Sequence, residues 1–395
     1  MFSPQSHKRI VVNIKDSQKF ARAVMALMNL NKQVIILPNH TPGTLAELKG
    51  EYDYIFSDSD FGLLTLFPTV HEISEDSEIV FFTSGSNGQF KKVLKKFKHL
   101  KNEVYELQKQ FGDLIADATI VATVSHQHIY GFLFKLLWPL MTNKNFLAET
   151  IEYPEQLEQV SKSLKNYVVV SSPAFLKRFY NPEFNSSQCL AIFSSGGFLP
   201  AETAQAIRAN FGVLPVEVYG STETGGIGFR KSADQLWQRF SPVSFTQMDD
   251  GRVAVTSSYF AEDRLVLSDQ LEIYPDGFKL LGRSDDIVKI EEKRVSLSEV
   301  NSKIKGTGWI KDSVVVAIEQ FGRQQTAGVL VLSEAGQNLL EQFGKHEFIK
   351  KLRTNLLDHF EPSVIPRKYR FIEELPYNEQ SKLERKKIER MFLET

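Results

Sequence analysis

Cysteine is almost absent from this chain of 395 residues, which contains only Cys189. A single cysteine excludes an internal disulfide framework and fits a reducing compartment. Because Cys189 lies on the approach to an apolar run, we predict a small buried side chain rather than a nucleophile.

Long hydrophobic runs are missing as well. The apolar stretch YGFLFKLLWPLM, at residues 130–141, is too short to span a bilayer and is interrupted by Lys135. The opening residues MFSPQSHKRIVVNIKD contain only a short apolar run before Lys15. We therefore expect no signal peptide and no membrane span, and a soluble cytoplasmic protein.

Net charge is also nearly absent, because 47 Lys and Arg residues face 48 Asp and Glu residues, a balance of −1. Such a balance gives no general electrostatic reason to bind nucleic acid or an anionic membrane. The hydrophobic content of 42% and the charged content of 24% are ordinary for a globular protein. The length predicts two or three domains.

Short apolar runs alternate with amphipathic segments through the first two-thirds of the chain, which predicts an α/β fold with largely parallel sheets. The pattern changes near Gly251 to hairpin-like strands with a turn at YPDGFKLLG, and after LLGRSDD to a smaller α+β segment. We place the domain boundary near residues 283–285. The expected strands are RIVVNI, QVIILP, YDYIFSD, EIVFFT, TIVATVS, YVVVSS, LAIFSSG and VEVYGS, and later SVVVAIE and TAGVLVLSE.

The stretch FFTSGSNGQFKKVLKKFKHL, at residues 81–100, combines glycines, hydroxyls and lysines. These suit a polyphosphate, because glycines let backbone N–H groups approach a ligand while hydroxyls and lysines add donors and charge. The spacing is not that of a Walker A loop. A strand-to-helix turn with a solvated basic face is the alternative. The lysines concerned are read as a solvated helix face or as a docking surface for acidic or phosphate groups; they are Lys92, Lys95, Lys96, Lys98 and Lys101.

Three further segments carry candidate chemistry. In VEVYGSTETGGIGFR, Thr222 and Glu223 follow a strand and would suit a phosphate oxygen and a magnesium ion. Asp269 and Arg283 are suited to bind a pair of sugar hydroxyls, and Lys382 lies in the segment LPYNEQSKLERKKI.

Two histidines, in the segment SHQHIYG, raise the question of a metal. His126 and His128 have no third ligand nearby in the sequence. They are therefore read as packing or substrate-contact residues rather than as a metal pair.

Together, in this order, the segments resemble the motifs of the adenylate-forming superfamily of acyl-CoA synthetases, peptide-synthetase adenylation domains and beetle luciferases. The match runs from about Val11 to Leu393. The matching segments are TSGSNGQFK for the phosphate loop, SHQHIYG for H-x-x-G, SSGGFLP for G-G-x-x-L, YGSTE for Y-G-x-T-E, LSDQL for the T-G-D position, GRSDDIVK for G-R-x-D-D-x-I-K and LPYNEQSK for L-P-x-T-x-x-G-K.

The resemblance implies that a carboxylic acid attacks MgATP to give an acyl-adenylate and pyrophosphate, and that a thiol then displaces AMP. The implied phosphate-binding residues are Thr83, Ser84, Gly85, Ser86, Gly88 and Lys91, with Thr222 at the α-phosphate and Glu223 at Mg²⁺. The implied nucleoside contacts are Gly196, Gly197 and Tyr219 for adenine and Asp269 and Arg283 for ribose, while Lys382 would stabilise developing charge.

The resemblance also implies an AMP-binding domain over residues 1–282 and a C-terminal lid over residues 285–395, turning about Asp285. The acceptor would be the thiol of CoA or of phosphopantetheine on an acyl carrier protein. Glu292 replaces a glycine of the family at the implied thiol tunnel and argues against free CoA.

The acid is expected to be a compact aryl or short acyl carboxylate, because Phe198 would narrow the pocket. The other implied pocket residues are His128, Phe132, Gly225, Gly226 and Ile227. YGSTETGGIGFR and KIEEKRVSL look like the stand-alone ligases of aryl-polyene pathways that load an acyl carrier protein.

A second class of function is a catalytically silent relative that binds nucleotide and acts as a sensor or partner module. Such a relative would be expected to lose some of the charged set. Glu223, Asp269, Arg283 and Lys382 are all present, which favours the enzyme.

Overall fold

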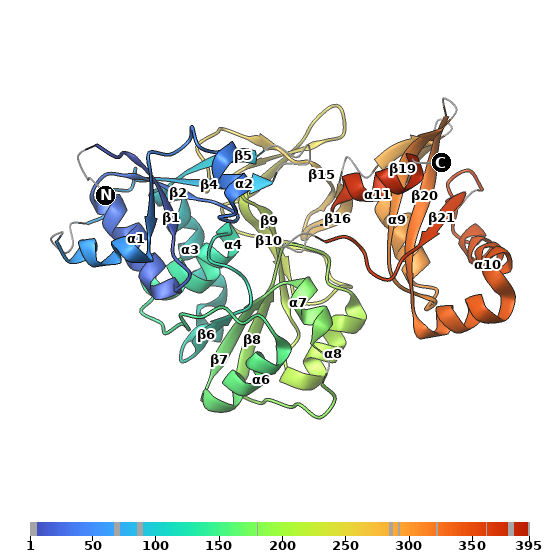
Figure 1. Ribbon diagram of the computed structural model, residues 1–395, viewed down its shortest axis with the longest axis horizontal. Coiled ribbons are helices and arrows are strands. Elements are labelled where there is room, and N and C mark those ends of the chain that lie inside the picture. The colour runs from blue at the N-terminus through green and yellow to red at the C-terminus, as the bar shows by residue number, and fades with distance from the viewer. Residues whose placement is uncertain are drawn as a thin grey trace. The chain divides into compact units, whose positions relative to one another are not determined.

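The computed structural model describes residues 6–66, 72–84, 90–179, 181–283, 287–290, 293–320, 323–360, 362–377 and 383–393. Within it the chain forms two compact units, Met1–Val266 with Ile273–Lys279, and Leu267–Glu272 with Leu280–Thr395. Each unit is described by itself (Figure 1).

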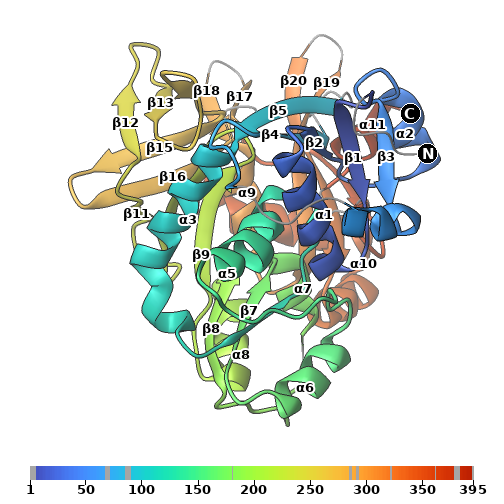
Figure 2. The same cartoon turned by 90° about the vertical axis from the view of Figure 1, so that its left-hand side faces the viewer.

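The first sheet of the first unit has the strand order β3-β1-β2-β4-β5. Its first four strands are parallel neighbours, and β5 runs antiparallel to β4. Helix α1 follows β1, begins after the N-cap Asp16, and packs on β1 and β2 (Figure 2). The strands are β1 Arg9–Asn13, β2 Gln33–Ile36, β3 Tyr54–Ser57, β4 Glu78–Ser84 and β5 Phe90–Lys96, and the helices are α1 Ser17–Asn29, α2 Pro42–Glu47 and α3 Phe97–Phe111.

The second sheet has the order β11-β10-β9-β8-β7-β6. Strands β6 to β9 are parallel, while β10 and β11 continue as antiparallel neighbours. The strands are β6 Thr119–Ala122, β7 Tyr167–Ser171, β8 Cys189–Ser194, β9 Val216–Ser221, β10 Gly225–Arg230 and β11 Gln238–Arg239. The helices are α4 Ile129–Gly131, α5 Trp138–Met141, α6 Pro154–Ser163, α7 Pro173–Arg178 and α8 Ala201–Phe211.

Smaller strand groups follow. Strands β12 Ser244–Gln247, β13 Val253–Thr256 and β14 Leu265–Val266 form an antiparallel sheet. Strands β15 Asp269–Tyr274 and β16 Gly277–Arg283 pair on either side of the predicted Pro275–Asp276 turn.

The second unit is a small α+β body. Strand β17 Ile287–Ile290 pairs with β18 Lys293–Ser296, and the sheet order β19-β20-β21 joins Ile310–Gln320, Arg323–Leu332 and Lys368–Phe371. Its helices are α9 Leu297–Lys305, α10 Glu334–Leu357 and α11 Arg385–Leu393. Apolar side chains of α9, α10, β19 and β20 share one buried cluster.

Several expectations from the sequence are confirmed. Each expected strand overlaps a strand of the structure, and the fold is mixed α/β with a large N-terminal part and a small α+β C-terminal part. Cys189 is buried in the apolar cluster beneath β7 and β8, and burial raises the pKa of its thiol to about 12. Among the described residues, no helix combines the length and the hydropathy that crossing a bilayer requires.

Candidate active site

The lysine-rich stretch lies on a strand before it enters a helix. Residues 90–96 form β5, in which Lys91 lies opposite Thr83 of β4. Helix α3 begins only at Phe97. The reading of Lys92, Lys95 and Lys96 as a helix face is therefore wrong; of the five lysines, only Lys98 and Lys101 lie on α3.

The two faces of β5 differ sharply. Lys92 and Lys96 are partly exposed and pair with Glu51 at 2.7 Å and with Asp76 at 3.0 Å. Lys95, on the other face, is only 1% exposed. Since alternate residues of a strand share a face, Lys91, Val93 and Lys95 point the same way.

Strands β9 and β10 are joined by a tight turn that carries Thr222 and Glu223. The hydroxyl of Thr224 accepts from the backbone N–H of Ser221 at 3.1 Å and donates to the carbonyl of Gly225 at 2.9 Å. A Cβ at Gly220 would come within 2.2 Å of the Gly225 carbonyl oxygen, so only glycine fits there. The turn is therefore closed by its own short side chains, with Thr222 half-buried.

Glu223 forms an ion pair with Lys91, whose Nζ lies 2.5 Å from Oε1 of the carboxylate. Burial is the largest single influence and would raise the pKa of Glu223, but the hydrogen bond and charge of Lys91, together with hydrogen bonds from the Glu223 main chain and the Ser221 side chain, outweigh it, and the pKa is lowered. Glu223 is thus a carboxylate at neutral pH, paired with a lysine that is 59% exposed. A residue of the phosphate-loop segment and a residue of the YGSTE segment meet at this pair.

Lys95 holds the same turn from its buried side. Its Nζ donates to the backbone carbonyl of Glu223 at 2.6 Å and to that of Tyr259 at 2.8 Å. Desolvation lowers the pKa of Lys95 to about 8, although nearby carboxylates, Glu103 among them, act in the opposite direction. The sequence analysis had counted Lys95 as one of a solvated set.

Glu103 of α3 is a second buried titratable side chain, and the sequence analysis did not identify it. Its Oε1 accepts from the backbone N–H of Gly226 at 2.6 Å, and a Cβ at Gly225 would meet its Oε2 at 2.6 Å. Burial raises the pKa of Glu103 to about 7 against the opposing effects of Lys95 and of that hydrogen bond. The glycines predicted to line the acyl pocket therefore leave room for a carboxylate of α3.

Tyr219 lies near the end of β9, with its ring centroid 5.7 Å from that of Trp237 and 6.0 Å from that of Phe278. The loop that carries the glycine pair is tied to the same strand, because the hydroxyl of Ser195 donates to the carbonyl of Val218 at 2.8 Å. A Cβ built on Gly196 would meet nothing within 4 Å, so space is open above this glycine.

The remaining predicted pocket residues differ in environment. Phe132 is buried and packs edge-on against Phe81, with ring centroids 5.5 Å apart, whereas Phe198 is 66% exposed. Ile227 is buried in β10, and His128 precedes α4 as its N-cap residue. Their roles at a substrate stay predictions.

His126 is a packing residue, as expected. Its ring nitrogens contact the Ser17 hydroxyl at 2.9 Å and the Ile14 carbonyl at 3.1 Å. Among the residues that the structure describes, no group of three or more His, Cys, Asp or Glu side chains is arranged to hold a metal ion.

Several predicted residues cannot be placed. Gly85, Ser86, Gly88, Asp285, Glu292 and Lys382 lie outside the described residues. Ser84 and Arg283 are described only as backbone at the ends of β4 and β16. Asp269 begins β15 and belongs to the second unit. The structure thus brings together Thr83, Lys91 and Glu223, and it adds Lys95 and Glu103.

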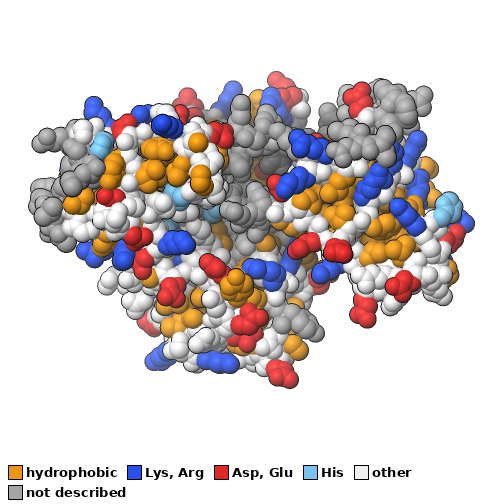
Figure 3. Space-filling view, in the orientation of Figure 1, with side chains coloured by type: hydrophobic (Ala, Val, Ile, Leu, Met, Phe, Trp, Pro, Cys, Tyr) orange, Lys and Arg blue, Asp and Glu red, His pale blue; other side chains and the backbone are white. Residues whose placement is uncertain are grey.

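On the face drawn in Figure 3, described Lys and Arg side chains of the first unit alternate with Asp and Glu. The mixture of signs agrees with the small net charge of the chain. Local pairing, such as that of Lys91 with Glu223, therefore matters more here than a broad charged field.

Comparison with known proteins places this chain in a family. The family model for AMP-binding enzymes matches residues 8–249, well over half of the chain. A 4-coumarate–CoA ligase of Cereibacter sphaeroides is 25% identical over 78% of this chain and 70% of its own length. A D-alanine–D-alanyl carrier protein ligase of Staphylococcus aureus is 23% identical over 87% of this chain and 75% of its own.

Solved structures agree on the fold. The o-succinylbenzoate–CoA synthetase of Bacillus subtilis, in complex with AMP, superposes with a TM-score of 0.78 at 16% identity, over 96% of this chain and 88% of that one. The chain belongs to the AMP-binding enzyme family and is an ATP-binding acid–thiol ligase of the adenylate-forming superfamily.

Proposed function

We propose that this ligase activates an aryl or short acyl carboxylic acid with MgATP and transfers the acyl group to a thiol. A carboxylate oxygen attacks the α-phosphorus, the bond to the bridging oxygen breaks, and pyrophosphate leaves. The thiolate sulfur then attacks the carbonyl carbon of the acyl-adenylate, and AMP leaves with the bonding electrons. Both steps bring anions together, so the chain must neutralise charge and position the reactants.

The pair of Lys91 and Glu223 carries this proposal. Lys91 lies opposite Thr83, the first residue of the segment TSGSNG, and its Nζ lies 2.5 Å from the carboxylate of Glu223. Lys91, with Thr83, Ser84, Gly85, Ser86 and Gly88, would bind the β- and γ-phosphates. Thr222 would donate to the α-phosphate.

A single carboxylate at this position suits Mg²⁺, which proteins often bind through one or two carboxylates and the substrate phosphates. Glu223 would hold the ion, which when bound neutralises phosphate charge. The lowered pKa of Glu223 keeps the carboxylate ionised for this role.

The adenine would lie at Gly196, above which space is open, and Gly197, beside Tyr219. Asp269 and Arg283 would bind the ribose hydroxyls. Lys382 would contact the substrate carboxylate and a ribose oxygen. We further propose that residues 1–282 and 285–395 act as separate domains that turn about Asp285 between the two steps.

The pocket for the acid would be lined by His128, Phe132, Phe198 and the segment from Gly225 to Ile227. An aryl acid is supported by two similar proteins, the 4-coumarate–CoA ligase and the o-succinylbenzoate–CoA synthetase. The carrier-protein ligase supports phosphopantetheine as the acceptor, with CoA as the other candidate. We place the chain in the aryl-polyene type of carrier-protein-loading ligases.

Carboxylate-dependent exchange of pyrophosphate into ATP, with a panel of aryl, short-chain and long-chain acids, tests this function. We expect exchange with aryl acids, and a loss of at least about 100-fold in Glu223→Gln and Lys382→Ala, which remove transition-state stabilisation. Lys92→Met, on the opposite face of β5, is the matched control and should keep the rate. Exchange that is as fast with palmitate as with benzoate would reject the aryl pocket. Absence of exchange with every acid of the panel would reject the adenylation reaction.

A further inference from the structure

We propose that Lys95 is a positioning residue for Glu223: it fixes the main chain of Glu223 from the interior, while Lys91 pairs with the carboxylate. The inference rests on the proposed role of Glu223 at magnesium and extends it to a residue that touches neither metal nor nucleotide.

The geometry divides the work between two lysines of one strand. Lys91 and Lys95 lie four residues apart on the same face of β5, and both reach Glu223. The Nζ of Lys91 lies 2.5 Å from the Glu223 carboxylate, and the Nζ of Lys95 lies 2.6 Å from its carbonyl oxygen. Side chain and main chain of one residue are therefore held from one strand.

The contacts of Lys95 connect segments that are distant in sequence. The two carbonyls that it binds belong to Glu223 and Tyr259, 128 and 164 residues along the chain. The ammonium also lies 5.8 Å from the ring centroid of Phe260. A buried ammonium is costly unless hydrogen bonds satisfy it, so these carbonyls fix where Lys95 can lie, and Lys95 fixes them in turn.

The turn itself leaves little freedom once it is anchored. Ser221 and Thr224 close the turn on either side of residues 222 and 223, with their hydroxyl oxygens 3.0 Å apart. The carbonyl of Glu223 is the point at which this closed turn joins the interior through Lys95. Removal of the anchor would let the carboxylate drift while the turn stays intact. Small misplacements of this kind are costly at catalytic sites.

The test is calorimetric titration of the full chain with ATP, once in saturating Mg²⁺ and once in EDTA. The dissociation constant in EDTA divided by that in Mg²⁺ reports how strongly the site couples ATP binding to the metal. This measurement needs no carboxylic acid. We expect Lys95→Met to reduce this ratio about 10-fold to 100-fold, as for residues that support a metal ligand. The dissociation constant in EDTA should change less than about 2-fold, since phosphate contacts of Lys91 remain.

Lys92→Met is the control, because it removes an exposed ammonium from the other face of the same strand, and it should keep the wild-type ratio. If the role of Lys95 were merely structural, its replacement would raise both dissociation constants by the same factor and leave their ratio unchanged. That result would overturn the proposal. If Lys95→Met does not fold, Lys95→Gln, which is shorter and uncharged, must show the reduced ratio, and an unchanged ratio there also overturns it. A wild-type ratio near one would reject Glu223 as the magnesium ligand, and the positioning role with it.

Discussion

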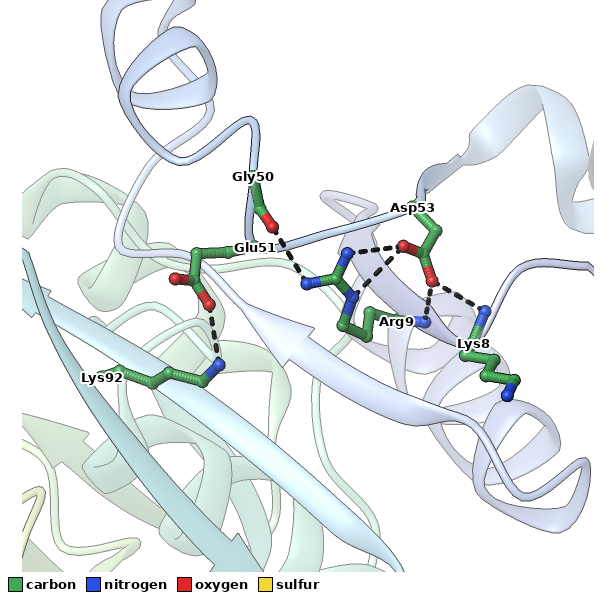
Figure 4. Close-up of polar contacts among 6 residues, drawn as sticks. All are labelled: Lys8, Arg9, Gly50, Glu51, Asp53 and Lys92. Atoms are coloured by element: carbon green, nitrogen blue, oxygen red, sulfur yellow. Dashed lines mark hydrogen bonds and ion pairs between the residues drawn. The ribbon is translucent and has the colours of Figure 1, made fainter.

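The first unit contains two groups of ions in opposite environments. In one, Arg9 binds the Asp53 carboxylate at 2.7 Å and Lys92 binds Glu51 at 2.7 Å, all at the surface around β1 and β5 (Figure 4). In the other, Lys95 and Glu103 are 1% and 4% exposed and bind backbone groups of the Glu223 turn and of β10. The side chains are of the same kinds, and only their surroundings differ.

The two carboxylates shift in opposite directions. The hydrogen bond from Arg9 is the main cause that lowers the pKa of Asp53 to about 2, whereas burial raises the pKa of Glu103 to about 7. In the surface group the partner determines the shift, and in the buried group the loss of water does. The comparison teaches that burial disfavours the charged form of a side chain and therefore costs free energy, and that this chain buries two such side chains at the predicted active site.

The largest effect is expected where the buried group is broken. Glu103→Ala removes the acceptor of the Gly226 N–H and one of the carboxylates near Lys95, so we expect a loss of about 3 kcal/mol in the free energy of unfolding. Urea unfolding followed by circular dichroism measures this loss. A loss below about 1 kcal/mol would mean that water or a neighbour replaces the carboxylate.

The next largest effect is expected in the pH dependence of stability, which should differ between the surface group and the buried group. The ordinary pKa of 4.5 is raised to about 7 in Glu103, so the folded chain keeps a proton that the unfolded chain releases. The stability that protonated Glu103 contributes is therefore fully present below about pH 4.5 and is lost as the pH rises to about 7. Between pH 5 and 7, the difference in unfolding free energy between wild type and Glu103→Gln should fall by about 2 kcal/mol.

Asp53→Asn is the comparator for this measurement. The pKa of Asp53 is lowered, so its contribution is present above the ordinary value of 3.8 and is lost only as the pH falls toward 2. The difference between wild type and Asp53→Asn should stay level between pH 5 and 7. A slope for Asp53→Asn like that of Glu103→Gln would contradict the contrast between the groups.

The smallest effect is expected in the surface group. Lys92→Met removes an exposed ion pair with Glu51, and such pairs contribute about 0.5 kcal/mol or less. The same unfolding experiment, repeated in high salt, should show that most of this small difference disappears. A salt-independent loss above about 1 kcal/mol would show that the pair acts as a buried one.

Much of the fold follows from local patterns in the sequence. The runs RIVVNI and YVVVSS became β1 and β7 because continuous β-branched residues suit strands buried on both faces. The prediction for the lysines was wrong because Lys92, Lys95 and Lys96 have the i, i+3, i+4 spacing of a helix face. In the structure they lie on strand β5, where Lys95 is on the opposite face from the other two. The pairing of Glu103 with Gly226 spans 123 residues, and no local pattern reports it.

The motifs predicted that the phosphate-loop segment and the YGSTE segment belong to one site, and Lys91 and Glu223 of these segments do meet. They could not predict what lies behind these residues. Lys95 supports a carbonyl, and any residue offers a carbonyl, so no side-chain type at position 223 signals the contact. Motifs record groups that face a ligand, whereas the supporting contacts depend on how the sheets pack.

The burial of Cys189 has a practical consequence for the site-specific labelling of this enzyme. It is the single thiol of the chain, it is 4% exposed, and its raised pKa keeps it in the unreactive protonated form. A cysteine introduced at a surface position of either unit would therefore react with a maleimide dye almost alone. Pairs of such cysteines would allow single-molecule fluorescence of the two units without first removing a native thiol.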